Sequence, residues 1–158
     1  MNTDELEYVG FWARVGAALI DTLLIAIVVW PVMHFVYCAD YSLDGAIIKG
    51  PVDFIVSWIL PAVAVIWFWI ARQATPGKMV IGARIVDAST GEPATTGQLI
   101  GRYFAYYVSI IPFMLGLIWV GIDPRKQGWH DKLANTVVVR TKNCGTQPVV
   151  FPAERPRV

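Results

Sequence analysis

The sequence predicts an all-α membrane protein with two full transmembrane helices, a third hydrophobic region broken by proline, and a small cytoplasmic β-hairpin or strand pair. Composition is the first observation behind this prediction. Of the 158 residues, 56% are hydrophobic and 16% are charged, with a mean hydropathy of +0.52. Soluble domains are about 45–50% apolar and about 25% charged. The other two observations are apolar stretches of membrane-spanning length and a proline inside the last of them.

Two stretches, Ala13–Tyr37 and Val52–Ile70, are long enough to span a membrane. A helix needs about 20 mostly apolar residues to cross a hydrocarbon core about 30 Å thick. The residues before the first span include Asp4, Glu5 and Glu7 but no lysine or arginine. A cleavable signal peptide has a positively charged start, so we expect the first span to be retained.

The third apolar region, Gln98–Ile122, contains Arg102 and is interrupted by Pro112. Because proline breaks helices, this region is expected to form two helices of roughly 24 Å and 15 Å, the second too short to cross alone. These helices are expected over Thr96–Ile111 and Phe113–Ile122. The region then forms either a re-entrant or two-helix arrangement, or else one tilted span of a three-span bundle.

The distribution of lysine and arginine predicts the topology, because cytoplasmic segments of membrane proteins carry an excess of both. The segment between the two spans, residues 38–53, has one lysine and three aspartates, so we expect it outside. We expect both termini inside, with residues 1–142 forming the transmembrane domain and residues 143–158 a flexible tail. Cys38 and Cys144 would then face opposite compartments, and no disulfide between them is expected. The basic residues that follow the second and third apolar regions are Arg72, Lys78, Arg84, Arg102, Arg125, Lys126, Lys132, Arg140 and Lys142.

Two segments rich in β-branched residues predict the strands. They are Met79–Asp87 and Thr136–Thr141. An isolated strand leaves backbone groups unpaired, so these two are expected to pair and therefore to share a compartment.

Arg14 and Asp21 lie within the first span, where lipid tolerates neither charge. Seven residues are about two helical turns, so both side chains point the same way, with Ala17 and Ala18 between them. This face is expected to pack inside a helix bundle. Asp21 is the deeper of the two, and Arg102 is the buried cation available to it. The pair either fixes helix packing or takes part in the transport of an ion or proton.

Asp123, Gln127, His130 and Asp131 recur at three- and four-residue steps, so on a helix they would share a face. We interpret them as a hydrated polar network rather than a metal site. His130 could act as a proton sensor or relay. The sequence TPGKMVIGAR lacks the residues of a phosphate-binding loop, and Lys78 in it is expected at the lipid headgroups. Without a nucleophile–base set or a cofactor motif, we expect no enzyme and no cofactor.

Three ordered motifs resemble the RDD family of small bacterial membrane proteins, which is named for one arginine and two aspartates. They are FWARVGAALID, TPGKMVIGARIVD and DPRKQGWHDKLANTVVV, within residues 10–139. The resemblance places the family's arginine on Arg14 and its first aspartate on Asp21. Its second aspartate falls on Asp123 or Asp131, with Asp123 preferred. Asn135 departs from the glycine expected in the last motif.

The resemblance implies a multi-pass protein of the bacterial inner membrane. It implies little about activity, but the family has been proposed to transport ligands, and some members are associated with sodium/proton antiport. The first hypothesis is therefore a small transporter or transporter subunit that exchanges a monovalent cation for protons, as a homo-oligomer or with a membrane partner protein. The second is a structural or accessory membrane protein whose Arg–Asp network only assembles the bundle. We expect no nucleic-acid partner. The candidate residues for the transport or polar network are Arg14, Asp21, Arg102, Asp123, Gln127, His130 and Asp131.

Overall fold

The computed structural model describes residues 6–37 and 50–141. The predictions for Cys38, Cys144 and the C-terminal tail lie outside these residues. In chain order, the elements are β1 (Leu6–Tyr8), α1 (Phe11–Tyr37), α2 (Pro51–Phe54), the π-helical segment η3 (Ile55–Ile59), α3 (Leu60–Arg72), α4 (Pro76–Val80), β2 (Ala83–Asp87), α5 (Thr96–Ile110), α6 (Leu115–Ile122), α7 (Trp129–Leu133) and β3 (Thr136–Thr141).

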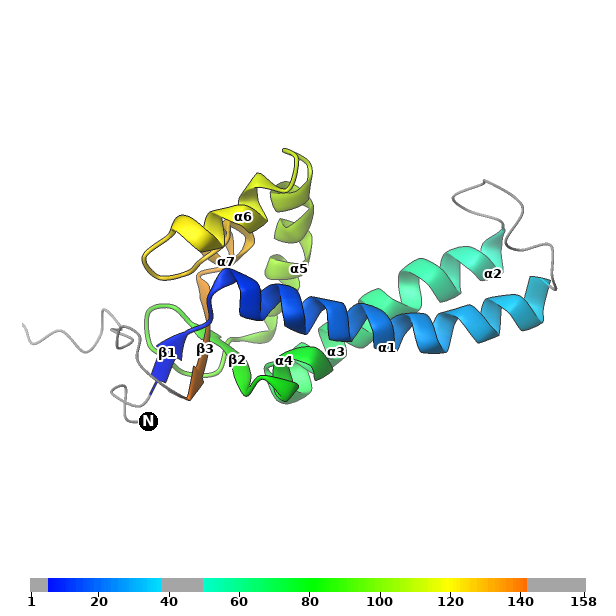
Figure 1. Ribbon diagram of the computed structural model, residues 1–158, viewed down its shortest axis with the longest axis horizontal. Helices are drawn as coiled ribbons and strands as arrows, with labels where there is room; N and C mark the ends of the chain where they lie inside the picture. Colours follow the sequence, from blue (N-terminus) through cyan, green and yellow to red (C-terminus); the bar gives the residue numbers. More distant parts are fainter. Residues whose placement is uncertain (1–5, 38–49, 142–158) are drawn as a thin grey trace, which may run out of the picture.

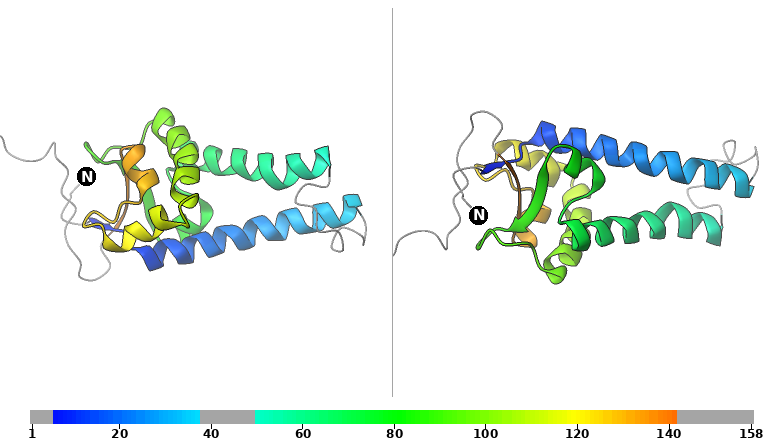
Figure 2. Two further views of the ribbon diagram at one scale, coloured as in Figure 1. Left: turned by 90° about the horizontal axis from the view of Figure 1, so that it is seen from above. Right: turned by 90° about the horizontal axis from the view of Figure 1, so that it is seen from below.

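Two long helices run side by side and project from one end of the molecule (Figures 1 and 2). One is α1, and the other is the continuous helix formed by α2, η3 and α3. Both are long and apolar enough to cross a membrane, with a mean hydropathy of 2.2 and only 6% of the most apolar stretch buried within the protein. The two predicted spans are therefore confirmed as apolar helices of sufficient length, each within two residues of the expected ends.

The third apolar region is broken, as predicted from Pro112. Helices α5 and α6 meet at a bend of 100°, and α5 runs across the direction of the two long helices (Figures 1 and 2). Phe113 and Met114 turn the chain with positive φ angles of 51° and 61°. Gly116 lets α6 fold back on α5, because a Cβ at this position would lie 2.7 Å from Ser109 Cα. This region forms no straight third span.

A three-stranded antiparallel sheet occupies the other end of the molecule, in the order β1-β3-β2. The predicted pairing of β2 with β3 is confirmed, with Asp87 opposite Thr136. Three details differ from expectation. The strand begins at Ala83, because Pro76 starts the short helix α4 instead. The two strands are not a hairpin, since α5, α6 and α7 lie between them in sequence. The third strand, β1, comes from the N-terminal segment.

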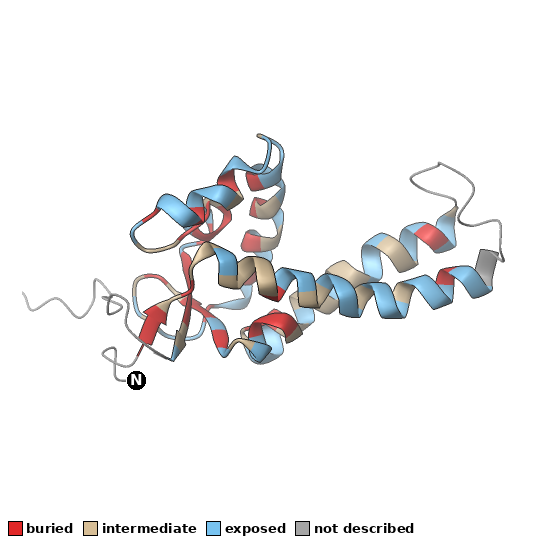
Figure 3. Cartoon of the chain, viewed as in Figure 1, coloured by how far each residue is buried: buried red, intermediate tan, exposed pale blue. Residues whose placement is uncertain are grey.

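The buried residues gather in the sheet, in α4 and in the helices around them, whereas the long helices are mostly exposed or half-buried (Figure 3). Strand β3 is apolar on both faces. Val137 and Val139 pack with Leu6 and Val86 on one face, and Val138 packs with a second cluster on the other. Members of this second cluster are Val9, Trp69, Ala83, Ile85, Ala94 and Leu99. The sheet end thus has a core like that of a water-soluble domain, while the exposed apolar surface of the long helices suits lipid.

Candidate functional site

A buried cluster of charged side chains lies where α1, α5 and α7 meet. Arg14 Nη1 lies 2.5 Å from Asp131 Oδ2, and Arg102 Nη2 lies 2.6 Å from Asp131 Oδ1. The side chains of Arg102 and Asp131 are fully buried, and that of Arg14 is 12% exposed. Two arginines therefore share one carboxylate, and this cluster carries an excess of positive charge.

Arg14 uses its whole guanidinium to connect three segments. Its Nε donates to the Val9 carbonyl at 3.0 Å and its Nη2 to the Lys126 carbonyl at 2.6 Å, while Nη1 reaches Asp131. The planar fork of arginine is suited to such multiple donation. The start of α1, the loop before α7 and α7 itself are thus held together by one side chain.

Asp131 and Arg102 also have partners besides each other. The Gly128 N–H donates to Asp131 Oδ2 at 3.0 Å, because the carboxylate of the third residue of α7 reaches back to the start of that short helix. Arg102 Nη1 donates to Thr136 Oγ1 at 2.9 Å. The start of α5 is fixed by a capping box between Thr95 and Gln98. Arg102 therefore lies against β3 in the protein interior and not on the lipid-facing surface.

The arginines control the ionisation of Asp131. Burial by itself would raise the pKa of this carboxyl, but the charges of Arg102 and Arg14 outweigh burial and hold its pKa well below the usual range. Asp131 therefore remains ionised at all physiological pH values. A carboxylate held in this way is unsuited to reversible proton exchange.

His130 is buried beside this cluster. Its ring stacks on Tyr106 with centroids 3.9 Å apart, its Nδ1 lies 3.2 Å from Ser109 Oγ, and its Nε2 lies 3.4 Å from Asp131 Oδ1. Burial lowers the pKa of His130 to about 3, although Asp131 acts in the opposite direction. The imidazole is therefore neutral in the folded protein.

This burial predicts that stability falls in mild acid. The unfolded chain binds a proton at a histidine pKa of about 6.5, so folding becomes less favourable as the pH drops below that value. Lowering the pH from about 6.5 to about 4 is expected to reduce the free energy of unfolding by roughly 3 kcal/mol, because the unfolded chain protonates His130 and the folded protein does not. The substitution His130→Asn is expected to remove this part of the loss, measured as the shift in melting temperature of detergent-purified protein between the two pH values. Equal acid-induced shifts in wild type and variant would contradict this prediction.

A second buried cation was not anticipated. Lys78, expected at the headgroups, is instead buried in α4, with Nζ 5.5 Å from the centre of the Trp69 ring. Arg102 Cζ lies at the same distance from that ring. Such cation–π contacts partly compensate for the lost hydration of both cations. Sequence gives no signal for this position, because the short helix α4 that buries Lys78 depends on packing against α1.

Asp21 forms a separate site. Thr75 Oγ1 donates to Asp21 Oδ2 at 2.5 Å, and the Gly77 N–H donates to Oδ1 at 2.6 Å. Gly77 is required for this approach, because a Cβ there would lie 2.0 Å from the Ala17 carbonyl oxygen. The predicted partnership of Asp21 with Arg102 is wrong, since Arg102 lies under the sheet with Asp131.

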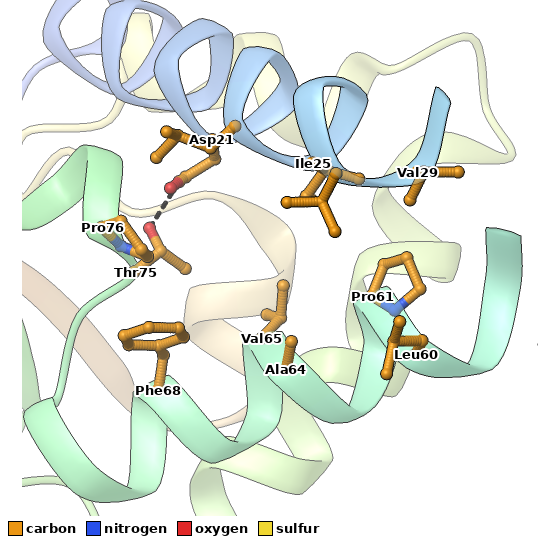
Figure 4. Close-up of a pocket in the computed structure, with 12 residues that line it drawn as sticks. Asp21, Ile25, Val29, Leu60, Pro61, Ala64, Val65, Phe68, Thr75 and Pro76 are labelled. Carbon is orange, nitrogen blue, oxygen red and sulfur yellow. Dashed lines mark hydrogen bonds between the residues drawn. The ribbon is translucent and has the colours of Figure 1, made fainter. Parts of the chain in front are cut away.

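A pocket of about 180 Å³ opens beside Asp21, between α1 and α3 (Figure 4). Asp21 and Thr75 face each other at one end of it, and the rest of the wall is apolar (Figure 4). The other lining residues are Leu24, Ile25, Val28, Val29, Leu60, Pro61, Ala64, Val65, Phe68 and Pro76. Within the described part of the chain, Asp21 is the acidic residue that lines this pocket.

The expected shared helix face of Asp123, Gln127, His130 and Asp131 is wrong. Asp123 follows the end of α6 and the chain then turns, so only His130 and Asp131 belong to α7. Asp123 pairs with Lys132 at 2.5 Å, and Gln127 Nε2 donates to the Thr136 carbonyl at 2.8 Å. Pro124 and Gly128 interrupt the helix that the spacing would otherwise suggest. No group of three metal-ligating side chains forms among residues 6–37 and 50–141.

Two apolar helices, a broken third region and a buried arginine–aspartate cluster together define a small helical membrane protein. The sequence model of the RDD family matches residues 8–135, so the chain belongs to the RDD family.

Several bacterial proteins are similar to this chain. The uncharacterized protein YxaI of Bacillus subtilis is 28% identical over 148 residues, which cover 82% of this chain and 95% of the relative. The uncharacterized membrane protein YteJ of the same species is 28% identical over 145 residues, covering 85% of this chain and 82% of the relative. Protein RP437 of Rickettsia prowazekii is 38% identical over 76 residues, covering 48% and 42%. No solved structure matches the chain.

Proposed function

We propose that the protein is a small membrane transport component that binds a monovalent cation or a proton at Asp21. The observation that carries this proposal is the position of Asp21, a half-buried carboxylate at the polar end of an otherwise apolar pocket between the two long helices. A carboxylate within a membrane span generally faces a bundle interior or a cavity and marks an ion or proton pathway.

Competition at one carboxylate would couple the two ions. The ionised carboxylate attracts a cation, and the protonated carboxyl does not, so binding of one releases the other. Asp131 does not suit this role, because two arginines already neutralise it. Asp21, by contrast, is held by a hydroxyl and a backbone N–H, both of them neutral donors.

A cytoplasmic position for the sheet end is part of this proposal. Arg84 and Arg140 lie in the sheet, Arg125 and Lys126 lie in the loop between α6 and α7, and Lys132 lies in α7. The bend between α5 and α6 lets the basic segments before and after it share one side of the membrane.

In spheroplasts of a bacterial host, Cys144 is therefore expected to resist a membrane-impermeant thiol reagent. Because Cys38 is expected outside, the test uses a Cys38→Ser variant, and labelling of this variant in intact spheroplasts would contradict a cytoplasmic tail.

An oligomer or a membrane partner is also proposed. Two long helices with a pocket between them cannot surround a continuous path across the bilayer. A symmetric assembly of identical subunits would supply the missing walls, as closed symmetry is the usual arrangement of homo-oligomers.

The second candidate function is that of an accessory membrane protein without transport activity. Its support is the Arg14–Asp131–Arg102 cluster, whose ion pairs connect α1, α5 and α7 and thereby assemble the sheet end. Because Arg14 pairs with Asp131 and not with Asp123, we infer that Asp131 is the second aspartate of the family's set. Its role is structural in either candidate function.

The two candidates differ in the effect of Asp21→Asn. In proteoliposomes that contain a pH-sensitive dye, sodium or potassium gradients are expected to drive proton movement with wild type. The amide cannot ionise, so the variant is expected to lose about tenfold or more of this flux. Glu92→Gln, an equivalent change at an exposed loop residue, is the matched control and is expected to retain wild-type flux. Absence of flux with correctly inserted wild-type protein would favour the accessory function.

A further inference from the structure

We infer that the Asp21 pocket selects organic monocations that carry an apolar body, such as aryl- or alkylammonium ions, over bare metal cations. This inference rests on the proposed function, since it names the class of cation that the same carboxylate would bind. It follows from the ligands that the pocket offers, from its volume and from its place between the long helices.

The pocket offers few oxygen ligands for a metal ion. The oxygen ligands at its polar end are the two carboxylate oxygens of Asp21 and the Thr75 hydroxyl, and the remaining wall is apolar (Figure 4). Hard cations such as calcium and magnesium take about six or more oxygen ligands in proteins. A metal cation in this pocket would lose much of its hydration without replacement, which is costly in an apolar environment.

An ammonium ion has different requirements. A carboxylate has about four lone-pair sites, and Thr75 and Gly77 each use one of them at Asp21. The remaining sites can accept N–H groups from the ligand. Burial of the ligand's hydrocarbon part against the pocket wall then adds a favourable contribution that a metal ion cannot make. The charge of Asp21 and the apolar wall together match one amphiphilic cation.

The volume sets the size of the apolar body. An engineered apolar cavity of about 150 Å³ in another protein holds one benzene molecule. The pocket beside Asp21 measures about 180 Å³. A single aromatic ring with a short aminoalkyl chain therefore fits, and Phe68 next to Thr75 provides an aromatic wall for it (Figure 4).

The surroundings of the pocket favour entry from the lipid. Leu24 and Val28 of α1 and Leu60 of α3 line the pocket and are themselves exposed on the surface of the long helices. An amphiphilic amine concentrates in the bilayer, so it can reach the pocket laterally. Lys78, the buried cation of neighbouring α4, opposes binding electrostatically, but its ammonium is directed at the Trp69 ring. Arg14 is likewise engaged with Asp131.

Binding of phenethylammonium to full-length detergent-purified protein tests the inference. Titration calorimetry is expected to show binding at least about tenfold tighter than that of sodium, potassium or the uncharged analogue 2-phenylethanol. Asp21→Asn is expected to weaken phenethylammonium binding by about tenfold or more.

Two adjacent residues of α3 provide matched variants that leave Asp21 in place. Ala64 lines the pocket and Val63 is 58% exposed outside it. Ala64→Phe fills the pocket and is expected to abolish phenethylammonium binding, whereas Val63→Phe is expected to retain it. Equal binding by these two variants would overturn the inference, and it would do so even if Asp21→Asn failed to fold.

The outcomes separate this inference from the proposed function. The inference is wrong if 2-phenylethanol binds as tightly as phenethylammonium, or if the Asp21→Asn variant binds phenethylammonium as tightly as wild type does. In either case the pocket is only an apolar or lipid-chain site. If phenethylammonium does not bind but sodium-driven proton flux depends on Asp21, the inference fails while the transport proposal stands. If phenethylammonium binds as expected without any flux, the inference stands and the transport proposal fails.

Discussion

Replacing Asp131 with asparagine is expected to lower the free energy of unfolding by about 3–5 kcal/mol, the usual cost of removing one partner from a buried ion pair. The change leaves Arg102 without its counter-charge in a fully buried position and removes the charge that Arg14 contacts. Repulsion between two buried cations then replaces attraction to one anion. The melting temperature of detergent-purified protein, followed by far-UV circular dichroism, measures the effect.

Asp123→Asn is the control for this prediction. Asp123 also forms an ion pair, but its partner Lys132 is 45% exposed, and solvent weakens such pairs. The asparagine oxygen can still accept from the Arg125 and Gln127 N–H groups that now bond to the carboxylate. A loss of about 1 kcal/mol or less is expected. If Asp131→Asn and Asp123→Asn had the same melting temperature, the buried cluster would not be the principal electrostatic contribution to the stability of the fold.

Gly77→Ala is also expected to destabilise the protein, by a steric mechanism. The added Cβ would lie 2.0 Å from the Ala17 carbonyl oxygen and 2.9 Å from Asp21 Cγ. Helix α4 must then move away from α1, which costs about 1–3 kcal/mol for overpacking and weakens the Gly77 N–H bond to Asp21. We expect a lower melting temperature together with loss of phenethylammonium binding.

Gly101→Ala provides the matched control within α5. A Cβ at Gly101 would meet nothing within 4 Å. In a helix interior alanine is favoured over glycine by about 1 kcal/mol, so this variant is expected to be as stable as wild type or slightly more stable. If the Gly77→Ala and Gly101→Ala variants had the same melting temperature, the α1–α4 contact would be able to relax without a loss of stability.

Local sequence signals predicted the two long helices and the break in the third apolar region, but not the short helix α4, which includes the expected start of a strand at Met79. The ends of the two long helices follow from hydrophobic length, and the break near Pro112 follows from the missing N–H of proline. Strand β1 gave no comparable signal, because a segment of three residues, Leu6–Tyr8, is too short to show a β pattern. It becomes a strand only because β3 offers it a free edge.

The candidate site was predicted in composition but not in pairing. Spacing on α1 correctly indicated that Ala17 faces the interior, where it is 1% exposed, but Ala18, expected on the same face, is exposed. Spacing could not indicate that Asp21 contacts α4 while Arg14 contacts α7. Those partners lie 54 and 117 positions away along the chain, and contacts at such separations are decided by packing of whole elements.

The sequence by itself determined that this protein has two helices suited to a bilayer, a broken third region and a strand pair, because hydrophobic length, proline and β-branched residues act locally. It also determined the family, through three ordered motifs. Only the tertiary structure decided which charges neutralise each other. The packing of the helices places Asp131 within reach of both arginines, and each arginine forms its ion pair there. Asp21 instead accepts hydrogen bonds from the neutral donors Thr75 and Gly77, at the end of an apolar pocket.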